Sequence, residues 1–137
     1  MDGSQEGNRL ALTTQQAAAE VGVSAHAIRY YERIGLVRVP RDERGHRAYD
    51  EACLRRLVFL IRMRKSGMTM ARLCRYLDLV EQGPDTRPQR LALLREHRES
   101  VCTTLAELQL ALDLTDHKIA TYGGNLGDES ATPEETS

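Results

Sequence analysis

The sequence predicts a mainly α-helical fold in which several short helices precede one long helix. Helix-capping residues alternate with glycines along the first 83 residues, as expected where short helices begin and end. Apolar residues recur every three or four positions between these boundaries, which is the period of a helix with one buried face. Neither glycine nor proline interrupts residues 89–122, so the last helix should be long.

Two short helices joined by a tight turn are expected near the start of the chain. Thr13 or Thr14 can cap the first helix, which Gly22 ends. Ser24 can cap the second helix, which Gly35 ends. This arrangement has the composition of a helix-turn-helix, a motif whose second helix enters a DNA groove.

A small β-hairpin, or wing, is expected after the second helix. Residues 36–40 alternate between apolar and other side chains, residues 41–47 form a turn around Gly45, and residues 48–49 return. Pro40 should keep the first strand short.

Two further helices are expected over residues 51–66 and 70–82, capped by Asp50 and Thr69. The expected buried stripes are Leu54, Leu57, Val58 and Ile61 on the first, and Leu73, Leu77 and Val80 on the second.

The long helix carries an unbroken heptad pattern. About 34 helical residues would span roughly 50 Å, which is too long to fold back along a domain of this size. The helix therefore needs a partner helix, and the simplest partner is a second copy; the alternative is packing on the body of a monomer. The heptad positions are Leu91, Leu94, Arg98, Val101, Leu105, Leu108, Leu112, Thr115, Ile119 and Tyr122.

Charge is divided unevenly along the chain. Residues 24–75 contain thirteen arginine and lysine residues against five acidic ones, whereas residues 76–137 contain five against twelve. We therefore expect only the first part to bind a polyanion, although charge also varies along chains that bind none.

Several functional classes are not expected. The apolar run at residues 57–61 is too short to span a membrane, and the polar N-terminus does not resemble a signal peptide, so we expect a cytoplasmic protein. No catalytic arrangement, phosphate-binding loop or paired set of metal ligands is evident, so we expect no catalytic residue, metal or cofactor. A coiled-coil adaptor is an alternative, but the arginines of the second helix argue against it.

Three motifs together resemble the MerR family of transcriptional regulators. They are the stretch Arg29–Tyr30–Tyr31–Glu32 with Gly35–Leu36, the wing segment Gly45–His46–Arg47–Ala48–Tyr49, and the helix end Ser66–Gly67. The resemblance covers roughly residues 12–122.

The resemblance implies a winged helix-turn-helix homodimer, whose long helices form an antiparallel coiled coil. It would bind double-stranded promoter DNA at a pseudo-palindromic operator. By bending and untwisting the DNA it would act on RNA polymerase indirectly. The implied organisation is a flexible arm (1–11), a DNA-binding domain (12–83), a dimerisation helix (87–122) and a disordered tail (123–137).

The candidate DNA-contacting residues lie in the helix-turn-helix and the wing. His26 and Arg29 are near the start of the second helix, where base contacts are made, whereas Ala27, Ile28, Tyr31 and Ile34 should face the core. Glu32 should orient an arginine. The full set is Thr13, Ser24, His26, Arg29, Tyr30, Arg33, Arg44, Arg47 and Tyr49.

Residues 76–126 look most like a branch of the family associated with aldehyde and electrophile stress. That branch often uses a reactive cysteine at a position where this chain has Arg62. The three cysteines are odd in number and widely spaced, which argues against disulfides. Cys53 is expected to be buried and inert, which leaves Cys74 and Cys102 as candidate thiol sensors.

Overall fold

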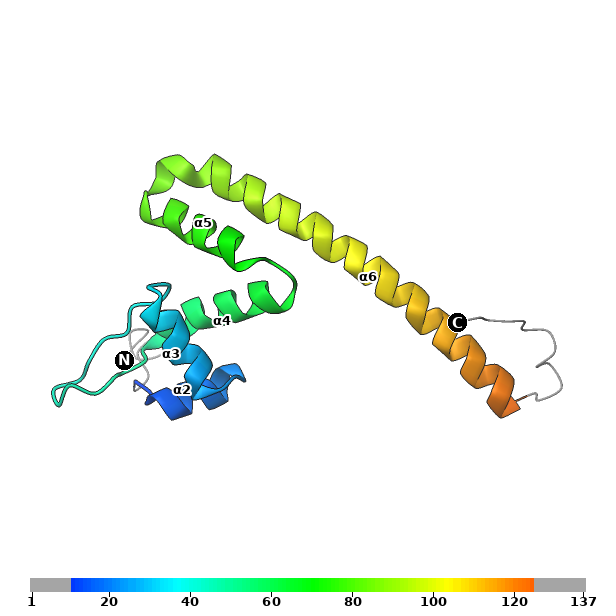
Figure 1. Ribbon diagram of the computed structural model, residues 1–137, viewed down its shortest axis with the longest axis horizontal. Coiled ribbons are helices and arrows are strands. Elements are labelled where there is room, and N and C mark those ends of the chain that lie inside the picture. The colour runs from blue at the N-terminus through cyan, green and yellow to red at the C-terminus, as the bar shows by residue number, and fades with distance from the viewer. Residues whose placement is uncertain (1–10, 125–137) are drawn as a thin grey trace, which may run out of the picture. The chain divides into compact units, whose positions relative to one another are not determined.

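The computed structural model describes residues 11–124, which fold into helices and connecting loops (Figure 1). The chain divides into two compact units between Leu94 and Arg95. The arm predicted over residues 1–11 and the tail predicted over 123–137 lie almost wholly outside the described residues. The elements are α2 (Thr14–Val21), α3 (Ala25–Arg33), α4 (Glu51–Lys65), α5 (Met70–Glu81), the 3-10 turn η1 (Pro84–Thr86) and α6 (Arg87–Gly124).

The short helices begin at the predicted capping residues. Thr13, rather than Thr14, caps α2: its Oγ1 accepts from the N–H of Gln16 at 3.1 Å, and Gln16 Oε1 accepts from the N–H of Thr13 at 2.9 Å. This reciprocal capping box pairs two N–H groups that α2 would otherwise leave without partners. Gly22 ends α2 with a φ of +82°, a conformation that a residue with a Cβ rarely adopts. Ser24, Asp50 and Thr69 cap α3, α4 and α5.

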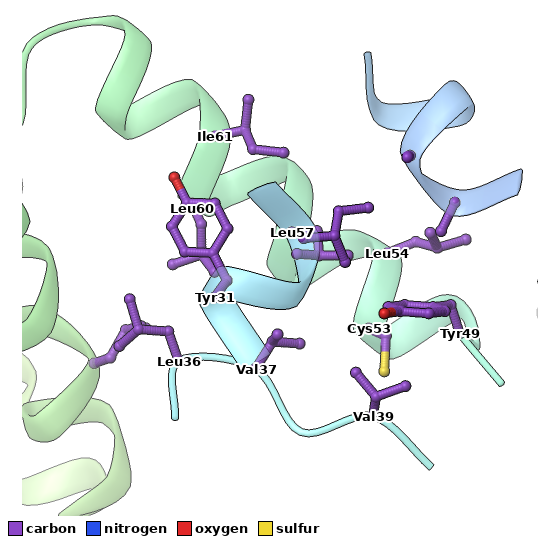
Figure 2. Close-up of a cluster of buried hydrophobic side chains, with 14 of the residues drawn as sticks. Tyr31, Leu36, Val37, Val39, Tyr49, Cys53, Leu54, Leu57, Leu60 and Ile61 are labelled. Atoms are coloured by element: carbon purple, nitrogen blue, oxygen red, sulfur yellow. The ribbon is translucent and has the colours of Figure 1, made fainter. Parts of the chain in front are cut away.

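A single hydrophobic core joins α2, α3, α4, α5 and the wing (Figure 2). Ala17 is fully buried on α2, where its small side chain allows close packing of the helices. Ile28 of α3 and Leu57 of α4 are also fully buried. Burying one such aliphatic side chain contributes roughly 1.5–3 kcal/mol. Residues Leu36, Val37, Val39 and Tyr49 bring the wing into the same core.

Three residues that we expected in the core lie elsewhere. Ile34 is 39% exposed because α3 ends at Arg33 and the chain turns away at Gly35. Val58 is 41% exposed, whereas Leu60 is buried, so the buried face of α4 is rotated from the one predicted.

On α5, Val80 is only partly buried and Leu79 is buried instead. The reason is that the chain turns back at η1 and packs against α5. Thr86 Oγ1 lies 2.5 Å from the carbonyl oxygen of Leu79, to which it donates, and so η1 covers this side of the helix. Arg90 Nη2 donates to the carbonyl of Gly83 at 3.1 Å, which ties the first turn of α6 to the same loop.

The predicted β-hairpin is present as a loop with isolated bridges, without regular strands among residues 11–124. Arg41 pairs with Arg47 at the turn, and Tyr49 pairs unexpectedly with Leu12. Pro40 is one reason why no regular strand forms, because it has no N–H to donate. Its carbonyl oxygen accepts from the N–H of Ala48 at 2.8 Å.

The long helix α6 is continuous over Arg87–Gly124, as the absence of internal helix breakers predicts. Despite this length, neither it nor any other helix within residues 11–124 is apolar enough to cross a lipid bilayer.

Cys53 is buried, as predicted, at the junction of α4 and the wing. Its Sγ donates to the carbonyl of Arg38 at 3.1 Å. Burial is the main reason why the pKa of the thiol is raised to about 11, and the side chain of the neighbouring Asp50 contributes in the same direction. The thiolate is therefore disfavoured in the folded protein.

This raised pKa predicts a loss of stability at high pH. The folded state favours the protonated thiol, so its contribution is complete below the unfolded pKa of about 9 and disappears as the pH rises through about 11. Between pH 8 and 11 we expect wild type to lose about 2 kcal/mol more unfolding free energy than Cys53→Ala. Urea unfolding at several pH values measures this difference. Parallel pH profiles for the two proteins would contradict it.

Candidate nucleic-acid interface

Helix α3 has one buried face and one exposed polar face. Ile28 and Tyr31 are buried at a spacing of three residues and hold the helix on the core. His26, Tyr30 and Arg33 are exposed and Arg29 is half-buried. The helix therefore presents a charged and aromatic surface from a backbone that its apolar side fixes in place.

The first turn of this face combines hydrogen-bond donors with the positive end of the helix. Ser24 Oγ accepts from the N–H of Ala27 at 3.1 Å, and His26 lies in the first turn beyond this cap. The guanidinium of Arg29 makes no hydrogen bond or ion pair within residues 11–124 and can therefore bind a base or a phosphate. The helix dipole favours a negative ligand at this end.

The last turns of α3 place a cation over an aromatic ring. The guanidinium carbon of Arg33 lies 5.6 Å from the centre of the Tyr30 ring, within the range of a cation–π interaction. The Tyr30 and Tyr31 rings are 5.8 Å apart and tilted by 59°. Tyr31 is thus the packed aromatic that we expected, whereas Tyr30 and Arg33 form one exposed polar surface.

An ion pair joins α3 to the wing. Arg47 Nε donates to Glu32 Oε1 at 2.5 Å, and Arg41 Nη2 lies 3.9 Å from Glu32 Oε2. The hydrogen bond from Arg47 is the main reason why the pKa of this guanidinium is raised. The structure confirms the interpretation that Glu32 orients an arginine, and it identifies Arg47 as that arginine.

The wing tip is a closed turn organised by Asp42. One carboxylate oxygen, Oδ1, accepts from the backbone N–H groups of Arg44 and His46, each at 2.9 Å. The N–H of His46 is the largest cause of the lowered pKa of Asp42. Gly45 allows the turn with a φ of +85°, and Arg44 extends from it with an exposed side chain.

One candidate DNA contact is wrong. Tyr49 is fully buried, and its hydroxyl accepts from Thr14 Oγ1 at 3.3 Å. Its ring packs in the core between the wing and the first helix, so it cannot reach a ligand. Thr13 and Ser24 are exposed caps whose hydroxyl hydrogens can still donate, and their contact with DNA stays a prediction.

Two arginines of α4 have structural roles that the sequence did not reveal. Arg56 Nη1 donates to the carbonyl of Leu36 at 2.9 Å, and Arg64 Nη1 donates to the carbonyl of Met68 at 2.8 Å. Each carbonyl follows a glycine with a positive φ, at Gly35 and Gly67. A glycine that ends a helix, followed by an apolar residue, is a sequence signal that could have predicted these contacts.

The predicted dimerisation residues lie along α6 and are exposed or half-buried within one chain. Leu94 and Val101 are half-buried, and the others are exposed: Leu91, Leu105, Leu108, Leu112, Ile119 and Tyr122. We call the surface formed by these heptad positions the seam.

The three cysteines differ in accessibility. Cys53 is buried, Cys74 is half-buried and Cys102 is exposed. Within residues 11–124 there is no group of three histidine, cysteine or acidic side chains that could hold a metal ion. A thiol sensor at Cys74 or Cys102 stays a prediction.

Two known protein families match overlapping parts of this chain. The family described as MerR HTH family regulatory protein matches residues 12–79. The family described as MerR, DNA binding matches residues 54–117. The two matches overlap on α4 and α5.

Individual relatives extend over most of the chain. An uncharacterized HTH-type transcriptional regulator from Haemophilus influenzae is 35% identical over 111 residues, which is 80% of this chain and 82% of the relative. The HTH-type transcriptional regulator MerD from Pseudomonas aeruginosa is 37% identical over 106 residues, which is 74% of this chain and 86% of MerD.

Two solved structures are also similar. A MerR family transcriptional regulator from Listeria monocytogenes has a TM-score of 0.74 and 38% identity, covering 85% of this chain and 89% of that one. HiNmlR, a MerR family regulator lacking the sensor domain and bound to promoter DNA, has a TM-score of 0.73 and 34% identity, covering 82% and 90%. This chain is a member of the MerR family of transcriptional regulators.

Proposed function

We propose that this protein regulates transcription by binding double-stranded promoter DNA as a homodimer. The observation that carries this proposal is the exposed face of α3. Arg29 and Arg33 of this face make no ion pair within residues 11–124, whereas Ile28 and Tyr31 on the opposite face are buried in the core. HiNmlR, which is bound to promoter DNA, shares this fold.

The start of α3 would enter the major groove. An arginine there can pair with the O6 and N7 acceptors of guanine, and His26 can contact a base edge or a phosphate. Tyr30 and Arg33 lie one turn further along and would donate to the sugar–phosphate backbone. Base reading would therefore rest mainly on Arg29, and the neighbouring donors would fix the helix in register.

The wing would contact phosphates beside this groove. Arg44 extends from a turn whose backbone is closed by Asp42, and the side chain of Arg47 is oriented by Glu32, so the ligand would not have to order either residue entirely. Preorganised donors bind with less loss of conformational entropy.

The seam of α6 would pair with the seam of a second copy in an antiparallel coiled coil. An isolated helix with six exposed large apolar residues at heptad positions would leave a long apolar surface in water. A two-fold homodimer carries two copies of α3, which explains why a pseudo-palindromic operator would be recognised.

Regulation would act through the shape of the DNA. A dimer that bends and untwists the DNA between its two half-sites can change the alignment of promoter elements. RNA polymerase would then be affected indirectly, through the DNA.

Replacing Arg29 by Ala should weaken operator binding about 10- to 100-fold, because the contact between the arginine and a base is lost. The preference for one base at that position of the operator should also be reduced. Selection of bound duplexes from a random pool, followed by titration of the recovered operator, measures both effects. Arg75→Ala removes the same charge from an exposed site on α5 and should change affinity less than about twofold. Equal losses in the two variants would mean that Arg29 contributes only charge.

Replacing Glu32 by Gln should lower the preference for operator over random DNA about 3- to 10-fold, because Arg47 is held less firmly. The change in unfolding free energy should be about 1 kcal/mol or less, since the pair is partly exposed. Glu43→Gln removes an equal charge from the wing tip without touching the pair. A gain in affinity shared by both variants would show that Glu32 acts only through its charge.

Replacing both Leu105 and Leu108 by Glu should convert the dimer into a monomer, because four carboxylates would enter the apolar seam. Sedimentation velocity measures the change in mass, and binding to an inverted-repeat operator should be lost with it. Ser100→Glu places a charge on the opposite side of α6 and should leave the dimer intact. A double variant that stays dimeric would place the dimer interface elsewhere.

A further inference from the structure

Two polar residues interrupt the seam of α6. Arg98 and Thr115 occupy heptad positions, whereas the other eight heptad positions carry apolar side chains. Both polar residues are exposed within one chain. The guanidinium of Arg98 makes no hydrogen bond or ion pair with the residues that the structure describes. A charged group that enters an apolar interface needs a hydrogen-bond partner there, and for Arg98 the second copy would have to supply it.

The apolar positions of the seam fix how two antiparallel copies align. One alignment sets every apolar heptad position opposite another apolar position: Leu91 lies opposite Tyr122 of the second copy, and Leu105 lies opposite Leu108 of the second copy. Sliding one helix by a heptad in either direction leaves apolar positions without an apolar partner. In the alignment found from the apolar positions alone, Arg98 lies opposite Thr115 of the second copy.

Thr115 is chemically suited to receive a guanidinium. Its Oγ1 donates to the carbonyl of Ala111 at 2.8 Å, so its hydroxyl hydrogen is already used within α6. The oxygen of a hydroxyl has two lone pairs that can accept hydrogen bonds. An N–H of Arg98 of the second copy can therefore donate to Thr115, and the two-fold axis repeats this contact at the other end of the helix pair.

One flank of the seam has complementary charges in the same alignment. Arg95 and Asp116 each follow a heptad position, and both are exposed on one side of α6. Antiparallel pairing brings Arg95 opposite Asp116 of the second copy, once at each end. The other flank, which includes His97 and Lys118, adds no pair of opposite charges.

We propose that Arg98 and Thr115, supported by Arg95 and Asp116, determine the orientation and register of the two α6 helices in the dimer. This inference rests on the proposed dimerisation through the seam, and the partner is a second copy of this chain. A polar residue at a heptad position can specify the register of a coiled coil while lowering its stability.

The competing arrangements lack an acceptor for the guanidinium. A parallel pair would place Arg98 opposite Arg98 of the second copy, where like charges repel. An antiparallel pair shifted by one heptad would place it opposite Leu108 or Tyr122 of the second copy. Only the alignment that the apolar positions favour also provides Arg98 with a hydroxyl oxygen.

The register would influence the spacing of the half-sites in an operator. Leu91 belongs to the same compact unit as α3. At 1.5 Å per residue, the two Leu91 residues of a dimer would lie about 45 Å apart along the helix pair, and a shift of one heptad would change this by about 10 Å. That change corresponds to about three base pairs of DNA. Operator spacing would thus depend on α6 as well as on α3.

A distance between two spin labels measures the register in the full chain. A nitroxide is attached at Ala120→Cys, outside the seam, in a chain that carries Cys53→Ala, Cys74→Ala and Cys102→Ala. The proposed register places the two labels about 40 Å apart in double electron–electron resonance. A shift of one heptad gives about 30 or 50 Å, and a parallel pair gives less than about 20 Å. Any main distance other than about 40 Å overturns the inference.

An apolar replacement of the pair separates register from affinity. The labelled chain with Arg98→Leu and Thr115→Leu should dimerise at least as tightly, yet it should show several distances, because nothing then opposes the alternative alignments. A single distance of about 40 Å in this variant would overturn the role of the polar pair.

A residue exchange tests the contact itself. Thr115→Arg should raise the dissociation constant of the dimer at least about tenfold, because two guanidiniums then face one another in each polar layer. Adding Arg98→Thr should return it to within about threefold of wild type. Ser100→Arg adds the same charge outside the seam and should have little effect. Sedimentation velocity measures the constants, and a double variant equal to the product of the two single effects would overturn the contact.

The register and the proposed function can fail separately. A dimer with another label distance overturns the register and leaves a dimeric regulator intact. A distance of about 40 Å in a protein that binds no inverted-repeat operator supports the register and contradicts the proposed function. A wild-type protein that is monomeric at every concentration overturns this inference together with dimerisation through the seam.

Discussion

The contact between Glu32 and Arg47 is the interaction on which the candidate DNA-binding surface depends. It joins the last turn of α3 to the second half of the wing, and no regular β-sheet connects these two segments. The core holds the base of the wing through Val37, Val39 and Tyr49, whereas the charged tip is held by the contacts of Arg47 and Arg41 with Glu32 and by its own turn. A carboxylate in a basic surface disfavours DNA by charge, so its structural role must outweigh that repulsion.

The arginines of this domain include two groups with different physical roles. Arg56, Arg64 and Arg90 donate to backbone carbonyls at turns, where an unpaired acceptor would cost about 1–3 kcal/mol. Arg29 and Arg44 extend from fixed backbone without such a carbonyl. Net charge alone therefore overstates the number of arginines that are available to a ligand. The field that attracts DNA includes every arginine of this domain, but those that donate to backbone carbonyls are less available for direct contacts.

Local sequence signals predicted most of the helices because capping is a short-range interaction. Thr13, Ser24, Asp50 and Thr69 each bond to an N–H three residues away, within reach of a pattern in the sequence. The positions of Tyr49 and Val58 depend instead on which segments pack together. A motif in the wing suggested a surface tyrosine, whereas tertiary packing placed its ring in the core. The sequence predicted that Glu32 orients an arginine but did not identify Arg47, because fifteen residues separate the two along the chain.

The exposed leucines of α6 connect the stability of the chain to its proposed activity. A monomer would hold Leu105, Leu108 and Leu112 in water, so the proposed pairing through the seam would stabilise the helix as well as assemble two copies of α3. Because the proposed operator is bound by both copies, its occupancy would depend on the square of the monomer concentration wherever dimers are scarce. A change at the seam would therefore alter DNA affinity without touching DNA. In this proposal dimerisation is a point of control distinct from base reading, because the seam belongs to α6 whereas base reading would rest on α3.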